Sequence, residues 1–192
     1  MTENEEAVRK LQMEILQALE NLMNEHGLML GGGTTLMLKY NHRFSEDLDL
    51  FVWDAARSKY EKILREIWKA LAGFNREERY QTIFVYKNDV KVKLELHVRK
   101  SSENKLLLAE NLGGIHVLSD EDILGEKIYY GERCTERDLF DVKFLMNKHS
   151  WGQTKVINIL NEKFYGRAEE ILEDLRRYCP KMWKTVMNVQ KD

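Results

Sequence analysis

Proline and cysteine are scarce in this sequence, and long apolar runs are missing. Its single proline, Pro180, leaves few rigid breaks among 192 residues. The two cysteines, Cys134 and Cys179, lie far apart without the spacing of metal ligands, which favours a reduced cytoplasmic protein. No run approaches a membrane span, and the charged N-terminus MTENEEAVRK lacks the apolar core of a signal peptide. We therefore expect a cytoplasmic protein without membrane association.

An excess of charge of one sign is also missing. The formal net charge of −2 gives no overall signal for nucleic-acid binding, so contact with RNA would need a local basic patch. No Ser-His-Asp or Cys-His arrangement of the kind used in covalent catalysis is visible. The chain is instead 43% hydrophobic and 32% charged, a soluble, helix-rich composition that suffices for one core or two small lobes.

The most informative stretch is residues 30–53, LGGGTTLMLKYNHRFSEDLDLFVW. The glycines at positions 31–33 leave the backbone free to adopt positive φ and allow a ligand to approach closely. Thr34 and Thr35 can cap the short helix that follows. Free N–H groups at the start of that helix would suit an anion, so the turn predicts a phosphate site.

A D-x-D pattern follows the glycine turn after a polar loop. Read as a strand, its alternation places Asp47 and Asp49 on one face and Leu48, Leu50 and Val52 on the other. Two carboxylates on one strand face, just beyond a phosphate-binding turn, predict a Mg²⁺ site that bridges to a triphosphate.

The segments GGGTTL and HRFSEDLDLF together resemble the signature of polymerase-β-superfamily nucleotidyltransferases. They are most similar to the AbiEii/AbiGii toxin-like branch, which pairs a G-G-T/S turn with R-x-S-x-D-[LI]-D-[LF]. The resemblance implies an α+β (mixed α/β) fold, with a polymerase-β-like palm of a small mixed sheet flanked by helices. A C-terminal helical lobe would close the active-site cleft. Because the composition shifts after His116, we place the palm at residues 1–116 and the helical lobe at 117–192.

Hydrophobic periodicity supplies the elements of both lobes. Helices are predicted at 7–25 and 58–71, from Ser119, from Thr135, and at 154–164, 168–178 and 180–189; strands are predicted at 28–30, 47–52, 80–86 and 90–98. Residues 101–114 are expected to be irregular. Strand, glycine turn, helix, loop and strand follow one another in the order that a polymerase-β palm requires.

The resemblance also implies the chemistry. A nucleoside triphosphate (NTP) would donate its nucleoside monophosphate to a hydroxyl acceptor and release pyrophosphate, with two Mg²⁺ ions held by Asp47, Asp49 and Glu95. The expected nucleotide-binding residues are the turn, two motif side chains and one lysine of the helical lobe, namely Gly32, Gly33, Thr34, Arg43, Ser45 and Lys127.

Glu95 is assigned from its place on a strand beside the D-x-D strand. Segment 90–98 alternates, so that Glu95 shares one face with Lys93 and His97 and with other basic residues. The family usually has aspartate at this place, one methylene shorter than Glu95. The alternative interpretation is a solvent-facing Glu95 that pairs with Lys93 or His97.

Two residues of the helical lobe are further catalytic candidates. Lys127 occupies a slot in an apolar stripe; it would either extend to solvent or, as the resemblance implies, bind the nucleotide phosphates. Asp141 lies mid-helix in an R-D-x-x-D pattern that matches the family, and its alternative is an i,i+4 pair with Arg137. Asp138 has a sufficient structural explanation in a capping box with Thr135.

The resemblance implies a toxin-like member of a toxin–antitoxin pair, with a cognate antitoxin protein as a possible partner. Its acceptor would be an RNA, such as the 3′ end of a tRNA, or a protein; a basic track of Lys91, Lys93, Arg99 and Lys100 hints at RNA. One alternative is a small-molecule nucleotidyltransferase of the kind that modifies antibiotics. The other is a degenerate, non-catalytic module that still binds the nucleotide.

Overall fold

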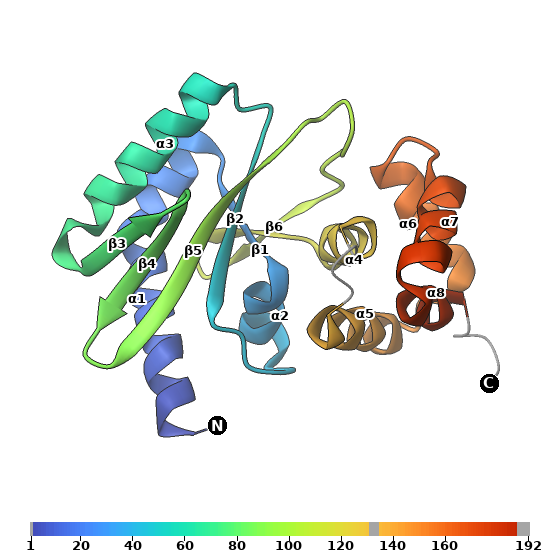
Figure 1. Ribbon diagram of the computed structural model, residues 1–192, viewed down its shortest axis with the longest axis horizontal. Helices are drawn as coiled ribbons and strands as arrows, with labels where there is room; N and C mark the ends of the chain where they lie inside the picture. Colours follow the sequence, from blue (N-terminus) through green and yellow to red (C-terminus); the bar gives the residue numbers. More distant parts are fainter. Residues whose placement is uncertain (1, 131–134, 188–192) are drawn as a thin grey trace. The chain divides into compact units, whose positions relative to one another are not determined.

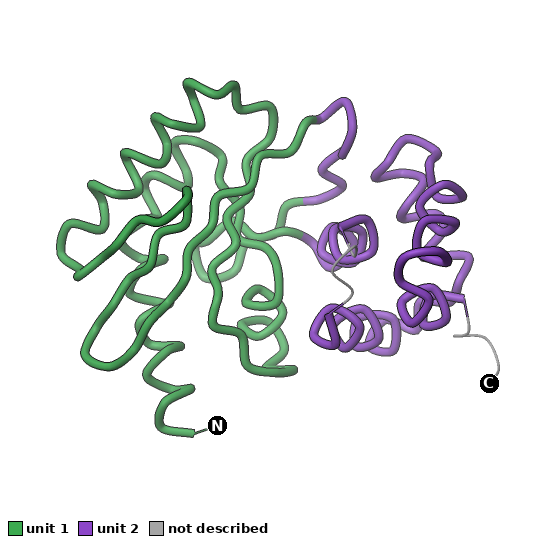
Figure 2. Tube along the Cα trace, viewed as in Figure 1, with its two compact units in different colours: residues 1–100, 109–118 green, residues 101–108, 119–192 purple. Residues whose placement is uncertain are grey.

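The computed structural model describes residues 2–130 and 135–187, and these form the mixed α/β fold predicted from the sequence (Figure 1). The chain divides into two compact units. Unit 1 comprises residues 1–100 and 109–118, and unit 2 comprises residues 101–108 and 119–192 (Figure 2). Within the described residues, no helix is both long and apolar enough to cross a membrane.

Unit 1 contains one seven-stranded mixed sheet with the order β3-β4-β5-β2-β1-β7-β6. Its strands are β1 (Met29–Gly31), β2 (Asp47–Trp53), β3 (Asn75–Arg79), β4 (Thr82–Lys87), β5 (Val90–Arg99), β6 (Ala109–Leu112) and β7 (Ile115–Leu118). Its helices are α1 (Glu3–His26), α2 (Gly32–Tyr40) and α3 (Arg57–Ala70), followed by a 3₁₀ turn, η1 (Leu71–Gly73). The central pair β2–β5 is parallel, and β1 runs antiparallel to β2.

The core of unit 1 lies between the sheet and two long helices. The side chains of Leu48, Leu50 and Leu94 on the central strands are buried in one cluster with Ile15 of α1 and Ile63 of α3. These helices cover the same face of the sheet (Figure 1). Apolar residues at every second position of β2 and β5 therefore fill the core, which leaves the alternate, polar positions on the other face.

Two hairpins were missed from the sequence. The strand β3, NREER, is mostly exposed and has no apolar alternation; it is ordered by pairing with β4 through a turn in which Tyr80 and Gln81 both have positive φ, 49° and 68°. The expectation that 101–114 is irregular is wrong for β6, which pairs with β7 through a turn at Gly113 and Gly114.

Unit 2 is a bundle of helices. They are α4 (Asp120–Tyr129), α5 (Glu136–His149), α6 (Gln153–Lys163), α7 (Ala168–Tyr178) and α8 (Pro180–Met187), close to the predicted ranges; residues 188 and 189 of the last range lie outside the described residues. Ser119 and Thr135 cap α4 and α5 as predicted. Cys179 is buried and disulfide-bonded, so the expectation of a reduced thiol is wrong for this residue; Cys134 lies outside the described residues.

Candidate active site

The register of β2 against β5 determines which polar side chains meet. Asp47 is paired with Lys93, Asp49 with Glu95, and Phe51 with His97 in this parallel ladder. Neighbouring residues of paired strands point to the same face of a sheet. The sheet therefore brings Asp47, Asp49 and Glu95 together on the face opposite the core, with Glu95 directly beside Asp49.

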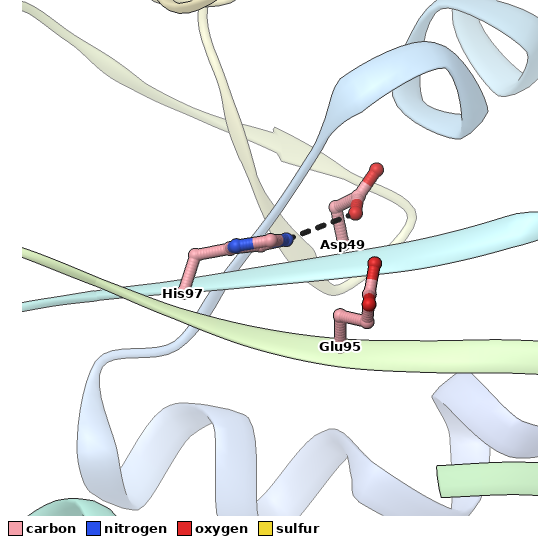
Figure 3. Close-up of side chains that lie close together, drawn as sticks. All are labelled: Asp49, Glu95 and His97. Carbon is pink, nitrogen blue, oxygen red and sulfur yellow. Dashed lines mark hydrogen bonds and ion pairs between the residues drawn. The ribbon is translucent and has the colours of Figure 1, made fainter. Parts of the chain in front are cut away.

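Asp49, Glu95 and His97 form a compact group of possible metal ligands. One ligand atom from each lies within 4.8 Å of the others, and all three side chains are partly buried. The ring nitrogen Nε2 of His97 lies 3.0 Å from Oδ1 of Asp49 (Figure 3). Asp47 shares their face of the sheet but does not belong to this group.

Glu95 also has partners on β5 itself and on the neighbouring strand β4. Its Oε2 lies 2.7 Å from the Lys93 ammonium, and its Oε1 accepts a hydrogen bond of 3.2 Å from the Thr82 hydroxyl. Burial would lower the pKa of Lys93, but the bond to Glu95 and the charges of Asp47 and Asp49 outweigh burial and raise it. The pairing of Glu95 with Lys93, considered from the sequence as an alternative, is present together with the approach to Asp49.

The glycine turn lies against two side chains of the motif, the Asp49 carboxylate and the Arg43 guanidinium. Gly32 has φ +66°, and a Cβ built on it would overlap Oδ2 of Asp49. A Cβ built on Gly33 would lie 2.5 Å from the guanidinium of Arg43 and 3.1 Å from the hydroxyl of Ser45. Glycine is required at position 32, where a positive φ and the Asp49 carboxylate both exclude a Cβ, whereas a Cβ at position 33 would require the end of the Arg43 side chain to shift.

Thr34 and Thr35 were predicted to cap α2, and that prediction is wrong for both. The helix begins at Gly32 with Gly31 as its N-cap and has no side-chain cap. The Thr34 hydroxyl instead bonds to the main-chain carbonyl of Asp47 and shares a 3.1 Å hydrogen bond with the Ser45 hydroxyl. Thr34 thus fastens the first turn of α2 to the start of β2, next to the carboxylates.

Replacing Gly32 with alanine is expected to reduce catalysis beyond its effect on stability. A left-handed φ costs an L-residue about 1–2 kcal/mol, and the added methyl would also displace the Asp49 carboxylate, which can lower a rate about 10²-fold. Gly27→Ala is the matched control, since Gly27 has φ +64° and no atom within 4 Å of a built Cβ. Thermal unfolding and transfer rates are compared; equal activity losses in the two variants would contradict the role of Gly32.

Lys127 and Asp141, the catalytic candidates of the helical lobe, belong to a second charged cluster, which lies inside unit 2. The Lys127 ammonium lies 2.9 Å from Asp138 and 2.8 Å from Asp141, and its side chain is only 10% exposed. Asp141 is completely buried, and Asp138 also bonds to the capping hydroxyl of Thr135. Lys127 therefore forms ion pairs with both aspartates of the R-D-x-x-D pattern on α5 and does not extend to solvent.

His97 and Lys93 were not among the predicted site residues. The alternation of β5 had placed both on the face of Glu95, so the signal was available. The alternation does not determine the register of β5 against β2, and it is this register that places His97 within reach of Asp49.

A family model described as nucleotidyl transferase AbiEii toxin, of type IV toxin–antitoxin systems, matches residues 14–185. The chain belongs to this family. The predicted family and enzyme class, a nucleotidyltransferase, are thereby confirmed.

Other proteins resemble this AbiEii-family chain along most of its length. An uncharacterized protein of Aquifex aeolicus, aq_aa25, is 27% identical over 195 residues, which cover 89% of this chain and 91% of the relative. The crystal structure of JHP933 from Helicobacter pylori is 19% identical with a TM-score of 0.57, covering 100% of this chain and 86% of that one. The solution structure of the antibiotic-resistance factor ANT(2″)-Ia is 17% identical with a TM-score of 0.54, covering 88% and 98%. The predicted polymerase-β-like nucleotidyltransferase fold is confirmed.

Proposed function

We propose that this AbiEii-family nucleotidyltransferase moves a nucleoside monophosphate from an NTP to a hydroxyl of RNA or protein at the β2–β5 carboxylates. The proposal is supported chiefly by the strand register, which places Glu95 beside Asp49, and by the glycine turn, which lies against the Asp49 carboxylate. Metal-dependent nucleotidyl transfer needs carboxylates and a phosphate-binding turn within one site. The acceptor class is the RNA or protein expected from the family resemblance.

The residues fit a divalent cation such as Mg²⁺. Asp47, Asp49 and Glu95 offer carboxylate oxygens on one sheet face, and carboxylates are the ligands that Mg²⁺ prefers. The Lys93 ammonium, on the same strand as Glu95, lies 2.7 Å from the Glu95 carboxylate. Bound there, the metal would offset phosphate charge and make the acceptor hydroxyl easier to deprotonate. We propose one or two such ions as the cofactor.

The chain's own groups have separate proposed tasks. The main-chain amides at Gly32, Gly33 and Thr34, at the N-terminus of α2, would bind the triphosphate, because free N–H groups and the helix dipole favour anions there. Arg43 would add a guanidinium beside Gly33, and Ser45 would hold the loop through Thr34. Positioning and charge stabilisation of this kind account for most of the rate in phosphoryl-transfer enzymes.

A toxin role and an antitoxin partner are the physiological part of the proposal. They rest on the family, whose description names a type IV toxin–antitoxin system. We propose that the protein acts in the cytoplasm, where NTPs and RNA acceptors occur together. Growth arrest on expression, relieved by a neighbouring gene product, is the expected phenotype; unimpaired growth of cells that contain active enzyme would contradict the toxin role.

Label transfer tests the proposed reaction. The protein is incubated with Mg²⁺, each α-labelled NTP in turn, and total RNA, total protein or an aminoglycoside as acceptor. Label on an RNA or protein band is the expected result. Label on the aminoglycoside alone would replace the proposal by the small-molecule alternative, and nucleotide binding without any transfer would favour the non-catalytic module.

Lys127 is proposed as a phosphate ligand, and Asp141 as the group that holds its charge. Lys127→Met is expected to raise the KM for NTP about 10- to 100-fold, the value of a charged hydrogen bond of about 1.5–3 kcal/mol. Steady-state kinetics and thermal unfolding are measured on the same preparations, with Lys181→Met as a control, since Lys181 is 72% exposed. Lower stability with an unchanged KM would make the Lys127 cluster purely structural.

A further inference from the structure

His97 lies beside the Asp49 and Glu95 carboxylates and was not among the metal ligands predicted from the sequence. It follows Glu95 by two residues on β5, so both side chains leave the same face of the sheet. Its register partner is Phe51, the second residue after Asp49, which places the imidazole diagonally across from the Asp49 carboxylate. The 3.0 Å between Nε2 and Oδ1 follows from this placement (Figure 3).

The imidazole is held in this orientation by its neighbours. Its ring packs on the Phe51 ring at a centroid distance of 5.0 Å and an interplanar angle of 31°, and its side chain is 31% exposed. Lys93 contacts Glu95 at Oε2 and is two residues from it along β5, on the side away from His97. An imidazole nitrogen and one carboxylate oxygen from each of Asp49 and Glu95 thus lie within 4.8 Å of one another.

We infer that His97 Nε2 is a ligand of the cation bound by Asp49 and Glu95, and that the site therefore prefers a transition-metal dication, with Mn²⁺ as the probe, over Mg²⁺. The inference deepens the proposed function and rests on its metal site. Mg²⁺ takes oxygen ligands almost exclusively, whereas imidazole favours first-row transition metals. In the tautomer that carries its hydrogen on Nδ1, His97 presents a lone pair at Nε2 to the metal.

A hydrogen bond from His97 that merely orients Asp49 would use the same 3.0 Å contact. The two roles differ in chemistry, because a glutamine side chain can still donate to Asp49 but offers the metal no imidazole nitrogen. His97→Gln is therefore the decisive variant. His149→Gln is its matched control, since His149 at the end of α5 makes a similar histidine–carboxylate contact, 2.6 Å to Asp120 at the start of α4.

The test measures metal binding without nucleotide or acceptor. Mn²⁺ is titrated by electron paramagnetic resonance, and pulsed measurements of the bound ion detect nitrogen nuclei in its coordination sphere. The wild-type chain is expected to bind Mn²⁺ more tightly than Mg²⁺ and to show a nitrogen signal. His97→Gln is expected to lose that nitrogen signal, which is the result that separates a ligand from an orienting partner. Its Mn²⁺ affinity is expected to fall at least about tenfold, since even an outer-shell partner is typically worth about 10- to 100-fold, with a smaller change for Mg²⁺. His149→Gln is expected to behave like wild type.

Three outcomes would overturn the inference: no bound Mn²⁺, bound Mn²⁺ without a nitrogen signal, or a nitrogen signal that persists in His97→Gln. The wild-type spectrum alone decides the first two, so the inference stays testable even if the variant folds poorly. Failure of the proposed function is recognised separately. A protein that binds Mn²⁺ through His97 but transfers no nucleotide would keep the metal site and lose the transferase.

Discussion

Replacing Asp49 with asparagine is expected to lower nucleotidyl transfer about 10³-fold while the fold is retained. Asp49 is the residue that the other parts of the site share, since it is paired with Glu95, contacts His97 and faces Gly32. Asparagine keeps the shape of the side chain and removes its charge. A metal contributes several kcal/mol of charge stabilisation in the transition state, and about 4 kcal/mol corresponds to about 10³-fold in rate.

Initial rates of label transfer and thermal unfolding test this expectation together. Asp89→Asn is the matched control, because it makes the same chemical change at an exposed residue in the turn between β4 and β5. The control is expected to transfer at the wild-type rate. If Asp49→Asn retained transfer within about tenfold of wild type, the loss would be too small for a metal ligand, and the reaction would have to be placed elsewhere.

The second large effect is on stability: Lys163→Met is expected to cost about 3–5 kcal/mol of the free energy of unfolding. The Lys163 side chain is completely buried, with its ammonium 2.5 Å from Asp122 and 3.5 Å from Glu126. Asp122 in turn accepts hydrogen bonds from the main-chain N–H groups of Leu107 and Leu108. Methionine fills similar space but leaves a buried carboxylate without its cation.

Urea unfolding followed by circular dichroism measures the effect. Lys181→Met is the control, since the pair between Lys181 and Glu136 is 72% and 79% exposed and therefore contributes little. Because Asp122 holds segment 101–108 through its main chain, proteolysis of that segment is also expected to rise in Lys163→Met. Equal stability of the two variants would contradict the proposed role of the buried pair.

The sequence was sufficient to predict the faces of the two central strands. Alternation in DLDLFV and in VKVKLELHV separates core from polar positions, because a strand's side chains point to opposite faces in turn. The side-chain partners could not be derived in this way. Whether Asp49 meets Glu95 or Lys93 depends on the register between two strands that are distant in sequence, and alternation within each strand carries no information about that register.

The strand β3 and the buried ion pair of Lys163 could not be predicted for other reasons. The strand β3 has no apolar residue to reveal it; its order comes from pairing with β4 and from the positive φ of Tyr80 and Gln81. Lys163 continues the stripe of Val156, Ile159 and Leu160 at helical spacing, as Lys127 does in its own helix. Apolar spacing alone does not distinguish a lysine that forms a buried ion pair from one that extends to solvent, and Lys163, unlike Lys127, lies in no motif of the family.

The most direct test of the central claim compares two labels on the same nucleotide. Wild-type protein is incubated with a divalent cation, its acceptor and an NTP that carries the label on either the α- or the γ-phosphate. Nucleotidyl transfer predicts α-label on the acceptor, γ-label released as pyrophosphate, and neither product with Asp49→Asn. If γ-label appears on the acceptor, or if α-label transfer persists in Asp49→Asn, the carboxylates of β2 and β5 do not catalyse the reaction proposed for them.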